Sequence, residues 1–455
     1  MRAVTVLVPA LLLALAGCFS PPDVGGPAAL PSPLDPFLVQ HDHWDASAHA
    51  LAWNVRELAW DALASPGARP GAHSVDLHGD LLAVGTAGES ASLTGGVNRP
   101  SETNGFVLVD VADPAAPRVL GKYHTDSPLS ADRTVVFSAD GKTVFVGGLG
   151  EVIAVDVSDP AAPAEAARFP NPRDGAHTVF AAEVDGTQFV YVIGNGLLTF
   201  SYDAAKKEFT LLSRYITATP EGLLDTPLGP DGATYARRDV YGHDVFAEKD
   251  PVTGRHLAYV AYAYEGVKIV DLSNPRLPVE VATWRASGEG APWYTHTIWV
   301  AHLEGRRVAV VGTEVFENRH LTTPSPVWVL DLTELESPKL LATWTNPGGK
   351  GSDNLLFSAH DLRITPEGLV ALSHYHGGVW VLDLRDLAAV EAAGTVPNLG
   401  YILPHRDNGW RPEGPCCFNL NFGGIPATMD VVMRGNHLFA ADFHTGFYAF
   451  EYVPS

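Results

Sequence analysis

The sequence predicts an all-β protein, a seven-bladed β-propeller closed by an N-terminal strand that completes the last blade. Three observations support this prediction. A short strand-like word recurs seven times, an unmatched strand-like segment precedes the first repeat, and the 455 residues include 44 Gly and 35 Pro. Many short strands separated by Gly and Pro turns are typical of closed β architectures.

The recurring word is an apolar strand that ends in an acidic residue and is often followed by a proline turn. Asp110, Asp156 and Asp271 close three of the words, and Asp before such a turn can accept a hydrogen bond from a backbone N–H two residues on. We therefore interpret them as turn formers rather than Ca²⁺ ligands. The clear copies span 105–117, 150–163, 266–278, 326–338 and 378–387, and weaker copies span 196–206 and 446–455.

Each repeat can be divided into four short strands. In the fourth repeat these are expected at 243–248, 257–264, 267–272 and 279–284. Four strands joined by tight turns form an antiparallel meander, and seven meanders arranged radially form a propeller. The last repeat ends at GFYAFEY without a fourth strand, so NVRELAW (54–60) is expected to complete that blade.

A second word places a histidine before Ser, Thr or Asp and an aliphatic residue. Because the first strand of a blade lies innermost, the residues at the word's first position are expected to ring one mouth of the central channel. Loops on the same face would add His374, His376 and His444, and the long connections 218–239 and 396–426 would roof the opening. The aligned residues are His73, Arg133, His177, His243, His296, His360 and Met429.

Two interpretations of these histidines remain open. Converging imidazoles suit a transition metal such as Cu, Zn or Fe, and would make a metal-dependent enzyme, for example an oxidoreductase, the alternative function. Alternatively, each histidine bonds to a carboxylate or hydroxyl within its blade. The adjacent residues that offer such groups are Ser74, Thr178, Asp244, Thr297 and Asp361. The candidate metal or channel-mouth residues are His73, His177, His243, His296, His360, His376 and His444.

The connection 396–426 also carries His405 and the adjacent pair Cys416 and Cys417. The Cα atoms of neighbouring residues are about 3.8 Å apart, so a disulfide between the two cysteines would be strained. An oxidising compartment favours this vicinal disulfide over a free pair, and metal ligation is a third option.

The charge balance discounts one class of partner. With 30 basic and 52 acidic residues, the formal charge is −22, which disfavours nonspecific attraction to phosphate backbones. We therefore expect no nucleic-acid partner. The acidity is also consistent with a role in solubility alone.

The N-terminus has the pattern of an export signal, with one Arg followed by an apolar run too short to span a bilayer. Leu15-Ala16-Gly17-Cys18 resembles the lipobox of prokaryotic lipoproteins, which implies that Cys18 becomes a lipid anchor outside the cytoplasmic membrane. A plain secretory signal that discards Cys18 is the alternative. The predicted organisation is a signal peptide (1–18), a Pro-rich tether (19–45) and the propeller (46–455).

The words VLVDVADPAAP, AVDVSDPAAP and KIVDLSNPRLP, each with an upstream AHDL-like strand, resemble the LVIVD-repeat family of secreted and surface-attached prokaryotic proteins. This resemblance covers about residues 48–455 and implies a β-propeller without an agreed activity. The sequence contains no G-x-S-x-G, H-E-x-x-H or phosphate-loop motif. We therefore expect a lipid-anchored propeller that binds an extracellular protein, peptide or glycan.

Overall fold

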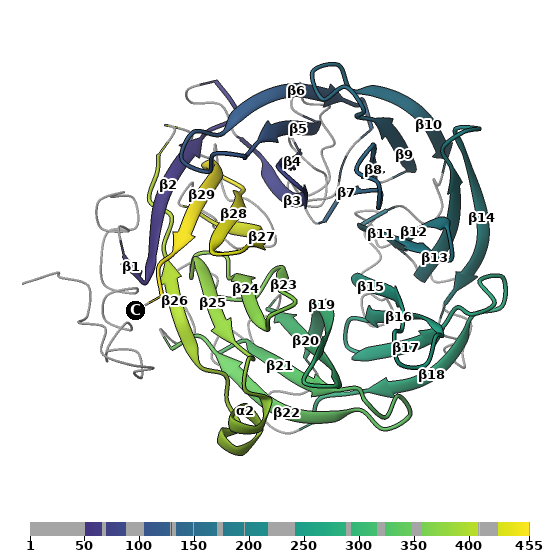
Figure 1. Ribbon diagram of the computed structural model, residues 1–455, viewed down its shortest axis with the longest axis vertical. Coiled ribbons are helices and arrows are strands. Elements are labelled where there is room, and N and C mark those ends of the chain that lie inside the picture. The colour runs from purple at the N-terminus through teal and green to yellow at the C-terminus, as the bar shows by residue number, and fades with distance from the viewer. Residues whose placement is uncertain are drawn as a thin grey trace, which may run out of the picture.

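Seven antiparallel sheets surround a central axis in the computed structural model (Figure 1). The structure describes residues 51–65, 70–87, 104–127, 129, 133–148, 150–170, 176–194, 196–216, 242–287, 293–315, 324–347, 357–407, 409 and 426–454. The fold is therefore the predicted seven-bladed β-propeller. The proposed signal peptide, Cys18 and the proposed tether lie outside the described residues.

The first three blades each contain four strands that pair in chain order. The first blade consists of β3 (Ala72–His78), β4 (Leu81–Thr86), β5 (Gly105–Asp110) and β6 (Arg118–His124). The second consists of β7 (Val135–Phe137), β8 (Thr143–Gly148), β9 (Glu151–Asp156) and β10 (Ala164–Pro170). The third consists of β11 (Thr178–Val184), β12 (Thr187–Gly194), β13 (Gly196–Asp203) and β14 (Glu208–Tyr215).

The fourth and fifth blades repeat this order, and the strands of the fourth match the predicted division. The fourth blade consists of β15 (Asp244–Lys249), β16 (His256–Ala261), β17 (Val267–Asp271) and β18 (Val279–Trp284). The fifth consists of β19 (Tyr294–Leu303), β20 (Arg306–Glu314), β21 (Pro326–Asp331) and β22 (Lys339–Thr345).

The sixth blade departs from the prediction. Its strands are β23 (Leu362–Ile364), β24 (Leu369–Ser373), β25 (Val379–Asp383) and β26 (Asn398–Ile402), with β1 (Ala52–Trp53) added outside β26. Helix α2 (Leu387–Ala393) stands where the first, second, fourth and fifth blades have a proline turn, which displaces the fourth strand along the chain. The expectation that 396–426 is wholly a roof is therefore wrong, because 398–402 is a blade strand.

The ring closes as predicted. The last blade is built from β27 (Thr428–Arg434), β28 (His437–Asp442) and β29 (Gly446–Tyr452), and β2 (Val55–Asp61) pairs antiparallel with β29. Val55 lies opposite Tyr452 and Asp61 opposite Phe447. The two ends of the propeller are thus hydrogen-bonded neighbours, as the purple and yellow strands of Figure 1 show.

The core lies between neighbouring blades rather than inside one. Successive residues of a strand point to opposite faces, so a radial sheet must be apolar on both. In β5, Phe106 and Leu108 pack against the second blade, while Val107 and Val109 pack against the last. This explains why the recurring word is an almost continuous apolar run.

The turn-forming role of the acidic residues is confirmed. The backbone N–H groups of Ala112, Ser158 and Ser273 donate to the Oδ1 atoms of Asp110, Asp156 and Asp271 at 3.0, 3.0 and 2.7 Å. Because these carboxylates accept backbone bonds at the outer rim, they hold the turns to the outer strands. Among the described helices, none is long and apolar enough to cross a bilayer.

Candidate functional site

The histidine position of the word coincides with an irregularity of the innermost strand. In the first and fifth blades the pairing register shifts at His73 and His296, and in the last blade it shifts at Met429. An extra residue in one strand is a β-bulge, which turns its side chain away from the regular sheet direction. In these three blades a local irregularity of the backbone therefore sets the direction of the side chain.

Four of the histidines form a continuous chain of ring contacts across adjacent blades. The ring centroids are 4.4 Å apart from His177 to His243, 3.8 Å from His243 to His296, and 4.6 Å from His296 to His360. His360 then packs edge-on against Tyr375 at 4.9 Å. The structure thus brings together the aligned histidines of the third to sixth blades.

The other candidates lie on other parts of the fold. His73 bonds to the carbonyl of Gly71 at 2.9 Å and to the hydroxyl of Thr134 at 2.7 Å, at the junction of the first two blades. His376 and His444 are buried in the loops after β24 and β28. His405 lies near Glu57 of the outermost strand of the last blade, 4.0 Å between Nδ1 and Oε2, rather than with the four.

His374 is a structural residue between the fifth and sixth blades. It packs edge-on against Trp344, and its Nδ1 lies 3.3 Å from the Asn346 amide nitrogen. Burial lowers the pKa of His374 to about 3, so its imidazole is neutral. Cys416 and Cys417 lie outside the described residues.

The clustered histidines bond mainly to the next blade, whereas one of the two interpretations of the sequence placed these bonds within single blades. His243 Nδ1 lies 3.1 Å from the carbonyl of His296, and His360 Nδ1 lies 2.6 Å from the carbonyl of Met429. His296 does meet a side chain of its own blade, Glu314 at the end of β20, 3.0 Å between Nε2 and Oε2.

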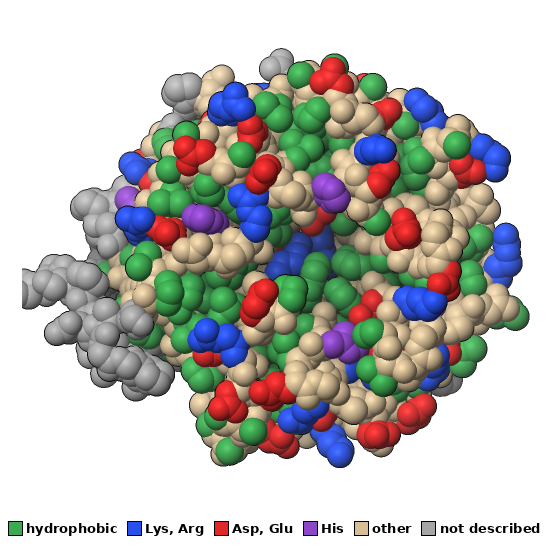
Figure 2. Space-filling view, viewed as in Figure 1, with side chains coloured by type: hydrophobic (Ala, Val, Ile, Leu, Met, Phe, Trp, Pro, Cys, Tyr) green, Lys and Arg blue, Asp and Glu red, His purple; other side chains and the backbone are tan. Residues whose placement is uncertain are grey.

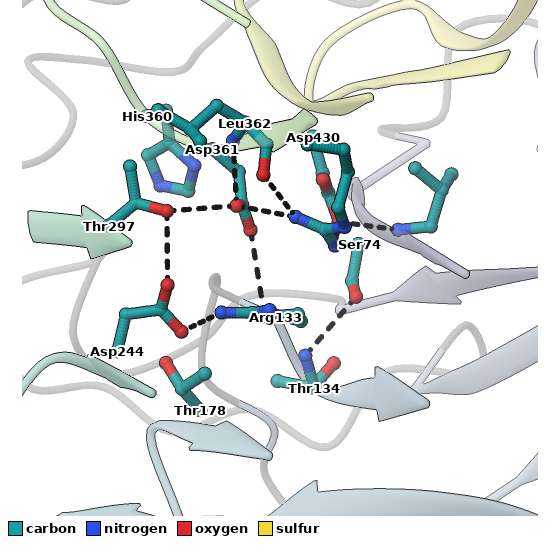
Figure 3. A network of polar contacts seen from close by, with 12 residues as sticks. Ser74, Arg133, Thr134, Thr178, Asp244, Thr297, His360, Asp361, Leu362 and Asp430 are labelled. Carbon is teal, nitrogen blue, oxygen red and sulfur yellow. Dashed lines mark hydrogen bonds and ion pairs between the residues drawn. The ribbon is translucent and has the colours of Figure 1, made fainter. Parts of the chain in front are cut away.

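The residues beside the histidines form a second, polar layer (Figure 3). The Asp244 carboxylate accepts from Thr297 Oγ1 and from the backbone N–H of Ile298 in the next blade, both at 3.0 Å. Asp430 accepts from the backbone N–H of Val75 at 2.9 Å, and so joins the last blade to the first. Each such carboxylate fixes one blade against its neighbour.

Two buried arginines pair with the carboxylates of this layer. Arg133 forms an ion pair with Asp244 and lies 3.8 Å from Asp361, and Arg363 bonds to Asp361 at 2.7 Å and to Asp430 at 3.4 Å. Burial alone would lower the pKa of Arg363, but the carboxylates of Asp361 and Asp430 raise it, so the guanidinium stays charged. Burial raises the pKa of Asp430, an effect that Arg363 opposes.

A third layer lies three residues further along each inner strand, about 10 Å from the histidines. Phe180, Phe246 and Trp299 pack together there, with centroid distances of 5.2 Å and 5.0 Å for the pairs that share Phe246. The Arg363 guanidinium lies 4.5 Å from the Trp299 ring centroid. The seven residues of this layer are Asp76, Val136, Phe180, Phe246, Trp299, Arg363 and Val432.

The sequence reasoning missed this layer, although the same alignment contains it. Three residues after the histidine position, the seven aligned repeats carry two charged residues, three aromatic residues and two valines. A buried apolar position would not show this mixture. Phe246 and Trp299 are partly exposed, and Figure 2 shows a hollow at the centre of the ring with basic side chains at its floor. Aromatic rings and guanidinium groups beside a hollow can bind a ligand by stacking and by hydrogen bonds.

The sheets, the closure and the layered inner wall define the class of protein, a seven-bladed β-propeller built from a degenerate repeat. The family model of the LVIVD repeat matches residues 101–125, 137–170 and 256–285. These segments contain the third and fourth strands of the first, second and fourth blades. The resemblance seen in the sequence is thereby confirmed for three blades.

Solved structures support the same fold. The structure described as U3-55K aligns with a TM-score of 0.50 and 11% identity over 87% of this chain and 98% of that one. The crystal structure of RRP9 WD40 repeats aligns with a TM-score of 0.51 and 11% identity over 87% and 97%. At this identity the likeness shows the fold alone. Among curated protein sequences, none matches this chain.

Proposed function

We propose that this chain is a lipid-anchored, extracytoplasmic propeller that binds a protein, peptide or glycan at the central hollow. The observation that carries the proposal is the partly exposed Phe246 and Trp299 beside the Arg363 guanidinium. Interaction sites commonly combine such aromatic and arginine anchors with a rigid frame. The polar layer supplies the frame, because it fixes neighbouring blades against each other.

The membrane location rests on the sequence. Leu15-Ala16-Gly17-Cys18 follows a short apolar run, and the next residues are rich in proline. In this proposal Cys18 carries the lipid, and residues 19–45 separate the propeller from the bilayer. Replacing Cys18 by Ser should move the protein from the membrane to the soluble fraction and abolish labelling by radioactive fatty acid. Unchanged labelling would contradict the anchor.

The binding site can be tested by affinity capture from native membranes. We expect the wild-type chain to retain a partner that the Trp299→Ala variant loses, because an aromatic ring of this size offers a large apolar contact surface. Leu277→Ala is the matched control, since Leu277 is an apolar side chain on an outer turn that is 67% exposed. Capture of no partner by the wild type, or equal capture by the Trp299 variant, would contradict the proposal.

A further inference from the structure

We propose that His243, His296 and Glu314 bind a divalent transition-metal ion of the class represented by Zn²⁺, at the histidine end of the channel. One ligand atom from each residue lies within 4.8 Å of the other two, and all three side chains are buried. The residues come from two adjacent blades. A bound ion would therefore connect the fourth blade to the fifth.

The distances are close to those of a metal site. Zn²⁺ binds imidazole nitrogen and carboxylate oxygen at about 2.0–2.2 Å in a tetrahedron, so two ligands of one ion stand about 3.3 Å apart. His296 Nε2 and Glu314 Oε2 are 3.0 Å apart. The widest pair in the group needs to contract by no more than about 1.5 Å to reach the tetrahedral spacing.

The outer contacts orient the ligands. His243 Nδ1 donates to the carbonyl of His296 at 3.1 Å, which leaves the lone pair of the neutral ring on Nε2. The Tyr375 hydroxyl donates to Glu314 Oε1, so the other carboxylate oxygen faces His296. Hydrogen bonds of this kind fix the tautomer and direction of metal ligands.

His177 lies beside this group without belonging to it. Its Nε2 is 2.8 Å from His243 Nε2, a hydrogen-bond separation, so a bound ion would replace the proton that the two rings share. Imidazole and carboxylate together favour Zn, Fe, Cu or Ni over Mg²⁺ and Ca²⁺, which prefer oxygen ligands alone. Co²⁺ serves as a visible probe for the same ligand set.

A second group with similar composition provides a control within the chain. Glu248, Asp250 and His302 also bring their ligand atoms within 4.8 Å. Asp250, however, forms a buried ion pair with Arg307, 2.6 Å from Nη2 to Oδ2. The guanidinium already neutralises this carboxylate and repels a cation, so we expect no ion there.

The test uses the full chain without a polyhistidine tag, stripped with a chelator and titrated with Co²⁺. We expect visible absorption that saturates at one ion per chain and disappears when Zn²⁺ is added. Glu314→Gln should abolish the signal, Tyr375→Phe should weaken binding about 10–100-fold, and His302→Gln should leave it unchanged. Zn²⁺ should also raise the melting temperature of the wild type but not of the Glu314 variant.

Three results would overturn the proposal. The first is less than about 0.1 ion per wild-type chain after equilibration with Zn²⁺ or Co²⁺. His296 and Glu314 would then be joined by a hydrogen bond alone. The second is equal binding by the Glu314→Gln variant, and the third is equal loss in the His302→Gln control. If Glu314→Gln does not fold, Tyr375→Phe decides the question, because unchanged affinity in that variant contradicts the site.

Discussion

Single polar side chains of the inner strands connect their own blade to others. Asp244 illustrates this, because its carboxylate accepts from Thr297 and from the backbone of Ile298 in the next blade. It also pairs with Arg133 beside the second blade and accepts from the backbone N–H of Val245 in its own strand. Such groups are buried, so each must have partners to offset the loss of water. One buried carboxylate therefore stabilises the contact between two blades.

Replacing Asp244 by Ala should lower the free energy of unfolding by about 3–5 kcal/mol, because the change removes one partner of a buried ion pair. Urea denaturation followed by circular dichroism measures this value. Asp80→Ala is the control, since Asp80 is largely exposed and bonds to Arg434 at 2.6 Å on the surface. The control should lower the free energy of unfolding by less than about 1 kcal/mol. Equal effects in both variants would contradict the role of Asp244 in holding blades together.

Asp442 should make stability depend on pH. Burial raises the pKa of Asp442 to about 7, although hydrogen bonds from Thr445 and His444 oppose the shift. The folded state thus favours the protonated acid, and the stability it contributes is lost as pH rises from about 4 through 7. Asp442→Asn should therefore gain at least about 1 kcal/mol relative to wild type on going from pH 5 to pH 8.

Denaturant unfolding of both proteins at the two pH values measures this difference. The comparison isolates Asp442, because every other titrating group is common to the two chains. A stability difference that is the same at pH 5 and pH 8 would show that the carboxyl does not titrate in this range.

At the scale of the strand, the recurring word contains a glycine at the start of the third strand for a steric reason. Gly266 has a φ of +87°, and a Cβ atom there would lie 2.1 Å from the carbonyl oxygen of Trp284 in β18. Gly446 has the same role in the last blade, where the carbonyl belongs to Asp61 of β2. The outer strand approaches so closely that only glycine fits.

Gly266→Ala should therefore destabilise the fold by more than the conformational cost alone. Gly254 provides the control, because its φ of +70° is similar but a Cβ atom added there would meet no other atom within 4 Å. We expect Gly254→Ala to lower the free energy of unfolding by about 1 kcal/mol and Gly266→Ala to lower it clearly more. Denaturant unfolding measures both values. Equal losses would mean that β18 moves away without cost.

The strands and turns could be predicted well from the sequence, because the same pattern recurs in seven copies. The seven words, the turn-forming aspartates and the strand 54–60 all follow from local pattern and strand count. Glu314 could not be predicted, because it lies beyond the repeated word and reaches His296 only through the bulge. The strand 398–402 was missed because helix α2 replaces the proline turn that follows the third strand in four other blades.

At the scale of the whole molecule, the channel wall has a different chemistry at each depth. Buried imidazoles occupy one layer, ion pairs that join blades occupy the next, and aromatic rings with arginine occupy the third. The middle layer keeps the ring rigid, so the other two layers keep their geometry. This arrangement depends on a closed ring, since an open one would lose the contact between the first and last blades.

Ring closure can be tested by the melting temperatures of two N-terminal deletions. Removing residues 19–40 should leave the melting temperature almost unchanged, because a Pro-rich segment buries little surface. Removing residues 19–60 deletes β1 and nearly all of β2, which exposes the edge of β29 and its apolar face. We expect this second protein to melt at a clearly lower temperature and to associate through the exposed edge. Two deletions that melt at the same temperature and remain equally monomeric would contradict closure by the N-terminal strand.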